Sequence, residues 1–167
     1  GRVHLDGFLS YPSAVYTVPY GVMVPKEVDN LLLPVPVSGS HIGFSTLRME
    51  PCWMAMGQAA GIASALSIDG KVKVQNIDLS RLQDKLIDQK ATLMYFKDVD
   101  YTSPHFRMVQ YLGLRGYLPE WTARLQEPVD ATTLAAWKKL SGTDLPGIEA
   151  GKTTRLATLE MIYRKIK

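Results

Sequence analysis

The sequence predicts an α+β fold that is mainly helical. Two apolar or β-branched runs before residue 40 indicate short β-strands. Residues 51–68 contain no charged side chain and are rich in alanine and glycine, which is typical of a buried helix. From residue 78 onward, apolar residues with a helical period follow cap residues, so we expect a helical C-terminal half.

The composition is that of a globular chain of 167 residues, with 46% hydrophobic and 21% charged residues. A chain of this size buries about 70% of its unfolded surface, which is enough for a hydrophobic core. The formal charge of +3 comes from scattered lysines and arginines rather than a basic stripe, so nucleic acid is not an expected partner. The lone cysteine excludes an intrachain disulfide.

The first strand is predicted at Ala14–Tyr20, whose Pro19 places it at a sheet edge or a strand end. A second extended run follows at Leu31–Val37. Residues 38–45 are rich in glycine and serine and are predicted to form a loop.

The Ala/Gly-rich helix is predicted over Pro51–Ser67, with proline in its favoured first position. Apolar residues lie on nearly every side of it, so we expect it to be the most buried helix. It lacks aromatic and basic flanks at both ends, and a core helix is therefore favoured over a membrane span. Alone, the chain must cover this helix with its own helical half or with a second copy, which makes a homodimer an expected state.

The later helices each have a start or stop signal. Asp78, Ser103 and Asp130 are expected caps. Gly116 and Gly142 are expected terminators. The predicted ranges are residues 79–90, 104–115, 131–140 and 153–166.

The sequence contains no motif for a metal site, a hydrolase nucleophile or a nucleotide-binding loop. His4, His41 and His105 are far apart, and no Cys/His metal spacing occurs, so no metal site is predicted. There is no Gly-x-Ser-x-Gly elbow, phosphate loop or Gly-x-Gly-x-x-Gly fingerprint. The start of the Pro51 helix could receive an anionic or electron-rich group. Gly57 and Gly61 share one helix face, which allows either close approach of a ligand or simple close packing.

Four segments occur in an order that resembles the C-terminal end of the FAD-dependent oxidoreductase family, some of whose members carry the label xanthan lyase-like. They are Tyr16–Tyr20, Val24–Leu32, Ser45–Cys52 and Met56–Ala63. The resemblance covers residues 12–90. It implies a glutathione-reductase-like FAD domain, to which this segment supplies a late strand and the helix that closes the flavin site.

By position, the resemblance implies that His41, Ser45 and Arg48 lie near the flavin. The start of the Pro51 helix would face the pyrimidine end of the ring system, where its dipole favours reduction. Gly57 and Gln58 would keep the helix close to the cofactor or to a neighbouring strand. No catalytic residue is assigned.

The resemblance also implies what the chain lacks. The phosphate-binding unit is not in the sequence, so we expect the C-terminal portion of a larger, bacterial enzyme whose partner is the rest of the FAD-binding domain. FAD is expected in the parent protein, and none is expected on this chain, which is catalytically incomplete alone.

The second half resembles an S-layer homology module over residues 95–142, with a half-repeat at 152–167. The matching features are Phe96–Val99, Ser103–Phe106, Gly116, Pro128 and Asp130. Such modules imply binding to a cell-wall polysaccharide, and the alternative is a helical appendage that packs on the oxidoreductase. We therefore divide the chain into residues 1–91 and 92–167. The compartment stays open, with an extracytoplasmic or cell-envelope location as one alternative.

Overall fold

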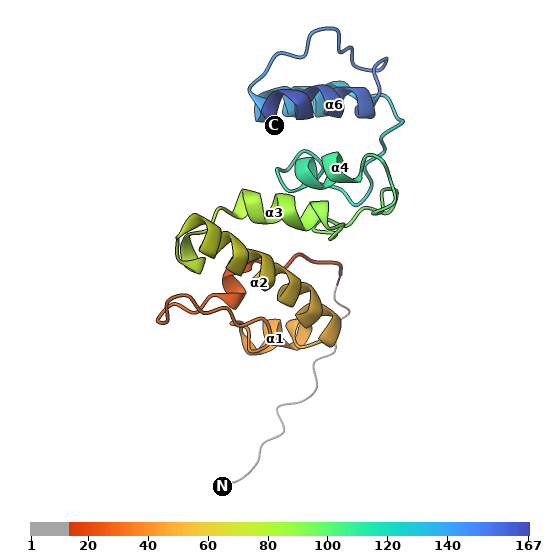
Figure 1. The fold of residues 1–167 in the computed structure, drawn as a ribbon. Coiled ribbons are helices and arrows are strands. Elements are labelled where there is room, and N and C mark those ends of the chain that lie inside the picture. Colours follow the sequence, from red (N-terminus) through yellow and green to blue (C-terminus); the bar gives the residue numbers. More distant parts are fainter. Residues whose placement is uncertain (1–13) are drawn as a thin grey trace.

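The computed structural model describes residues 14–167, which form a stack of helices (Figure 1). Helices α2, α3, α4 and α6 follow one another through the stack, and each packs on the next. The elements are η1 (Tyr20–Met23), α1 (His41–Leu47), α2 (Glu50–Gly70), η2 (Val74–Asn76), α3 (Leu79–Asp88), α4 (Phe106–Gly113), α5 (Ala131–Ser141) and α6 (Arg155–Ile166).

The predicted α+β class and its short strands before residue 40 are wrong, since residues 14–167 contain no β-sheet. Residues 14–19 and 31–37 run without a partner strand, and the expected late strand is not formed. Three prolines in these runs have no N–H to donate to a ladder. The Leu33 N–H instead donates to the Met23 carbonyl at 2.8 Å. Any strand in residues 1–13 would lie outside the described part.

Helix α2 is longer than predicted, and the expectation that it is buried on all sides is wrong. It buries one stripe against the residues before it and against α3. On the opposite side, Met54 is 75% and Ile68 is 76% exposed. The buried residues of α2 are Met56, Ala60, Ala63, Leu66 and Ser67.

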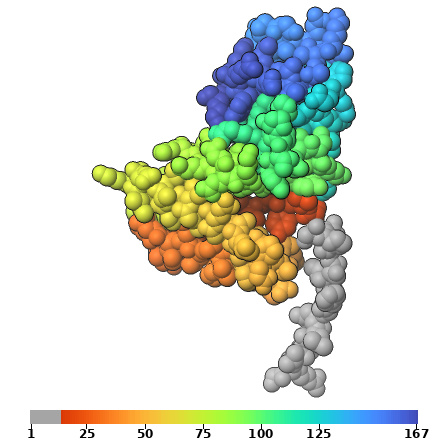
Figure 2. Space-filling view, turned by 45° about the vertical axis from the view of Figure 1, so that its right-hand side comes forward, coloured from red at the N-terminus to blue at the C-terminus, as the bar shows by residue number. Residues whose placement is uncertain are grey.

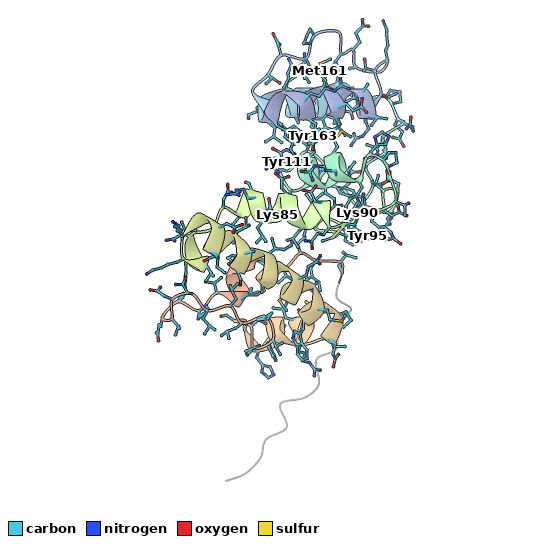
Figure 3. The ribbon with its side chains drawn as sticks, viewed as in Figure 1. Lys85, Lys90, Tyr95, Tyr111, Met161 and Tyr163 are labelled. Atoms are coloured by element: carbon cyan, nitrogen blue, oxygen red, sulfur yellow. The ribbon has the colours of Figure 1, made fainter. Side chains whose placement is uncertain are left out.

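Helix α4 is the most buried helix, in place of α2. Seven of its eight residues are buried, because α3 covers one side of it and α6 another. Between α4 and α6, Tyr111 and Tyr163 meet edge to face with ring centroids 5.2 Å apart (Figure 3). The largest hydrophobic cluster gathers here and contains buried residues between Phe96 and Ile162.

The predicted loop at residues 38–45 is wrong for its second half, which forms α1. Ser40 accepts a hydrogen bond from the Gly43 N–H at 3.1 Å and so caps the helix. The serine that indicated a loop in the sequence is therefore the residue that starts this helix.

The later helices lie close to their predicted ranges, and two of the three predicted caps, Asp78 and Asp130, are confirmed. The predicted cap Ser103 is wrong, because its hydroxyl accepts from the His105 N–H in a turn that precedes α4. Asp78 accepts from two backbone N–H groups of α3, Asp130 from Thr133 in α5, and Thr154 from Ala157 in α6. Gly142 ends α5 in the left-handed conformation. Helix α4 begins at Phe106, two residues later than predicted.

Polar contacts join α3 to the residues beyond residue 92, and Figure 2 shows the segment of α3 lying against the segment that follows it. The Arg107 guanidinium pairs with Asp84 at 3.1 Å and also with Asp88. At the other end of the chain, the Lys167 ammonium lies 3.3 Å from Asp84. Helix α3 is thus the bridge between the two halves. None of the helices between residues 14 and 167 combines the length and apolarity that a membrane span needs.

The Asp130 cap predicts an acid-sensitive contribution to stability. The Thr133 hydroxyl and N–H donate to Asp130 and lower the pKa of its carboxyl. Because the folded state binds this proton more weakly, the stabilisation is present above the unfolded pKa of about 4 and is lost as pH falls through the folded pKa. Asp130→Asn keeps an acceptor but cannot titrate, so its stability deficit relative to the natural chain should shrink between pH 6 and pH 3 in urea unfolding.

The matched control is Asp144→Asn, at an exposed aspartate whose side chain makes no hydrogen bond within the described residues. Its difference from the natural chain should stay constant over the same pH range. A deficit of Asp130→Asn that does not change with pH would contradict the prediction.

Candidate functional site

A cleft lies between residues 16–20, α2 and α3. Its volume is about 870 Å³, within the range of about 300–1,000 Å³ that is usual for ligand sites. Residues 91–93 and Leu114 complete its wall. The residues from α2 and α3 are Cys52, Ala55, Met56, Gln58, Ala59, Leu79, Leu82, Gln83 and Leu86.

Two tyrosine hydroxyls hold the extended wall of the cleft in place. The Tyr16 hydroxyl donates to the Thr46 carbonyl at 2.8 Å, and the Tyr20 hydroxyl donates to the Val74 carbonyl at 2.9 Å. The Tyr16 hydrogen bond reaches α1, and the Tyr20 hydrogen bond reaches η2. We did not predict either tyrosine as a site residue, although the period-two spacing of Tyr16, Val18 and Tyr20 was a usable signal.

The cleft is electrically neutral. None of the described residues that line it is Asp, Glu, Lys, Arg or His. Burial raises the pKa of the Tyr20 phenol. Burial, and next the neighbouring Cys52 thiol, raise the pKa of Tyr16. Both phenols therefore stay protonated at neutral pH, and the cleft suits an apolar or uncharged polar group.

Three of the predicted site residues lie together, but outside the cleft. His41, Ser45 and Arg48 are four and three residues apart, so they share one face at α1 and its C-terminal end, and all three are exposed. The Ser45 hydroxyl donates to the Ile42 carbonyl at 2.6 Å. Within residues 14–167, the side chains of His41 and Arg48 make no hydrogen bond or ion pair, so both are available to a partner.

The other two predicted residues lie on α2. Gln58 lines the cleft, and its side-chain amide donates to the side chain of Gln89, the residue that follows α3, at 2.9 Å. Gly57 faces open space, since a Cβ placed there would meet no atom within 4 Å. The close packing expected at Gly57 is therefore not made by the described residues, and the five residues divide between two places.

The first turn of α2 has fewer free backbone N–H groups than the sequence predicted for a helix N-terminus. The helix begins at Glu50, and Pro51 has no N–H. The N–H groups of Cys52 and Trp53 both donate to the Met49 carbonyl, at 3.0 and 3.1 Å. What remains for an anion is mainly the positive end of the dipole, which the Glu50 carboxylate opposes.

The residues present do not fit an intact FAD molecule. Its two phosphates carry negative charge, whereas the cleft holds no cation and the sequence has no glycine-rich phosphate turn. Only the uncharged part of such a molecule would match the cleft. Over residues 14–167, no group of three or more His, Cys, Asp or Glu side chains is placed to hold a metal ion.

Comparison with protein families matches residues 4–86 to the family described as FAD dependent oxidoreductase. The predicted resemblance is thus confirmed at the level of the family for this region, and residues 87–167 lie beyond the match. The family implies FAD in its parent proteins. Searches of curated proteins and of solved structures gave no match.

Proposed function

We propose that this FAD-dependent oxidoreductase region closes one side of a flavin site whose phosphate-binding part lies outside these 167 residues. In this proposal the chain contributes contacts to the oxidoreductase but is not catalytically complete by itself. The family match over residues 4–86 carries the proposal. The neutral cleft supports it, because a segment that does not grip the phosphates needs no charged lining.

The exposed face of α1 is the part that we expect to meet the flavin site. Arg48 offers a permanent cation, and Ser45 and His41 offer polar groups on the same side of the helix. Arg48 would supply a charge-assisted hydrogen bond to an electron-rich acceptor, while α1 and the start of α2 exclude water from that side.

A buried donor near the start of α2 also supports an outside partner. The indole N–H of Trp53 is shielded from water and finds no acceptor among the described residues. An unpaired buried donor costs about 1–3 kcal/mol, and a carbonyl from another part of the enzyme would remove that cost.

Binding of FAD to the isolated chain is expected to be weak. A helix dipole contributes about 0.3–1 kcal/mol, and one charge-assisted bond from Arg48 contributes about 1.5–3 kcal/mol. Their sum of at most about 4 kcal/mol corresponds to roughly millimolar affinity. Isothermal titration of the purified chain with FAD measures this directly. A micromolar Kd, or a yellow preparation, would show that the chain holds more of the flavin site than we propose.

The oxidoreductase role itself is tested on the complete product of the gene. We expect it to show the visible absorbance of a flavin, and Arg48→Ala to lower its flavin content or shift its reduction potential. The matched control is Arg81→Ala, at an exposed arginine on α3. A complete product that takes up no flavin would end the proposal.

A second candidate function is binding of a cell-wall polysaccharide or a protein by residues 92–167. It draws on an exposed aromatic pair, in which Tyr95 and Trp121 meet edge to face at 6.3 Å. The Lys97 ammonium lies 5.9 Å from the Trp121 ring. Retention on purified wall polysaccharide, lost in Trp121→Ala, would support this function. Retention equal to that of a control protein at low salt would exclude it for this chain.

A further inference from the structure

Buried side chains border the cleft between residues 16–20, α2 and α3, so it is a recess and not a flat face. They are Met23, Met56, Leu82 and Leu86. Ala55, Ala59 and Ala91, which also line the cleft, are too small to fill it, and its volume is about 870 Å³. A recess of this size with a mainly apolar lining is usual for a small-molecule site.

One wall of the cleft comes from residues beyond the family match. Residues 91–93 and Leu114 line it, whereas the match ends at residue 86. The Gln110 side chain holds this wall, because its oxygen accepts from the Leu93 N–H at 2.8 Å. The region shared with FAD-dependent oxidoreductases therefore does not form the cleft by itself. Since the exposed face of α1 lies outside the cleft, the surface that we assign to the flavin site is a different one.

Helix α3 turns a mainly apolar side towards the cleft. Its lining residues have the spacing of one helix face and are Leu79, Leu82, Gln83 and Leu86. Gln83 is the polar member, and within residues 14–167 its side chain makes no hydrogen bond. Its amide therefore has both N–H groups free to donate to a ligand. An apolar body with a hydrogen-bond acceptor matches this lining.

The wall formed by residues 16–20 favours an aromatic ring. Hydroxyl hydrogen bonds to backbone carbonyls hold the Tyr16 and Tyr20 rings. Tyr20 packs with the buried Met23 and Met56, whose thioethers make favourable contacts with ring edges. No described lining residue is charged, so an ionised ligand would lose its hydration without a counter-charge. We propose that the cleft binds an uncharged aromatic molecule with a carbonyl group, which accepts a hydrogen bond from the Gln83 amide.

This ligand is a second small molecule beside the flavin of the proposed function. The inference goes beyond that function and does not rest on it, because the described residues form the cleft and binding is measured on the chain alone.

Equilibrium dialysis of the 167-residue chain against coumarin tests the inference. Coumarin is an uncharged two-ring molecule with one carbonyl, and we expect saturable binding of one molecule per chain. Coumarin carboxylate, which carries a negative charge, should bind about tenfold more weakly or worse. The absence of saturable coumarin binding, or equal binding of the charged molecule, overturns the inference.

A variant that fills the cleft locates the site. Ala55 is exposed and lines the cleft, so Ala55→Leu should weaken coumarin binding about tenfold or more while the helical circular dichroism is retained. Ala65→Leu is the matched control, at an exposed alanine of α2 that does not line the cleft. Coumarin binding that Ala55→Leu leaves unchanged would place the ligand elsewhere and overturn the inference.

The role of Gln83 is tested with a ligand that lacks the carbonyl. Gln83→Leu should weaken coumarin binding about fivefold and leave naphthalene binding unweakened, because only coumarin accepts the hydrogen bond. Gln126→Leu, at an exposed glutamine outside the cleft, should change neither. An equal loss for both ligands, or no loss for coumarin, overturns the assigned ligand class.

The complete product of the gene separates this inference from the flavin proposal. After flavin uptake it should still bind coumarin, because the flavin is assigned to the α1 face. A product that binds coumarin but no flavin would end the proposed function and leave the inference standing. Loss of coumarin binding on flavin uptake would show that the flavin ring itself takes the cleft, and would overturn the inference of a second ligand.

Discussion

Replacing Trp137 by alanine is expected to lower the free energy of unfolding by about 3–5 kcal/mol. The side chain is 2% exposed and belongs to the largest hydrophobic cluster. Its indole N–H donates to the Tyr117 carbonyl at 2.7 Å, and the Arg155 guanidinium lies 5.0 Å from its ring. Alanine would leave a cavity and an unpaired carbonyl at once. Such a loss approaches the whole stability of a small domain.

Urea unfolding followed by circular dichroism measures this effect. Trp137→Phe keeps most of the packing but loses the hydrogen bond, so its loss should be clearly smaller. Trp121→Ala is the matched control at an exposed tryptophan, 47% accessible, and should change stability by about 0.5 kcal/mol or less. Equal losses at Trp137 and Trp121 would refute the position of Trp137 in the core.

Replacing Gln110 by alanine is expected to cost about 2–4 kcal/mol of stability. This glutamine is 0% exposed in α4. Its side-chain oxygen accepts from the N–H groups of Leu93 and Met94, both at 2.8 Å, and its amide donates to the Met94 carbonyl at 2.7 Å. The three bonds attach the segment after α3 to the C-terminal core. Without them, three backbone groups lose their partners.

A glutamine of the same helical stack provides the control. Gln89 is exposed and shares one side-chain hydrogen bond with Gln58, so Gln89→Ala should cost about 0.5 kcal/mol or less. Hydrogen exchange gives a second measurement, because the Leu93 and Met94 amides should lose protection in Gln110→Ala. Unchanged protection at those two amides would argue against the role assigned to Gln110.

Several elements were predictable because their signals are local. Asp78 and Asp130 cap helices by accepting hydrogen bonds from N–H groups two or three positions away, so each cap and its donors lie within one stretch of sequence. Gly142 similarly ends α5 through its own backbone conformation. Local bonds of this kind form whatever the rest of the chain does.

The candidate site was predictable only in part. The face shared by His41, Ser45 and Arg48 was named from the family resemblance, although the helix that creates it was predicted as a loop. The cleft was missed because its walls come from segments distant in sequence. Residues 16–20 line it together with residues of α2 and α3 that lie more than 30 positions later in the chain.

The sequence by itself determined approximately where the helices of residues 78–167 start and end, and the family that residues 4–86 match. Caps, periodicity and family motifs are local patterns, so they can be recognised without the tertiary structure. Only the tertiary structure decided which surfaces are buried. A strand needs a partner for its N–H and C=O groups, and residues 14–37 find none in the described chain. Helix α2 is apolar around its circumference, but its neighbours cover one side and leave Met54 and Ile68 in water. Burial depends on what lies opposite a residue in space, and that is a property of the assembled fold.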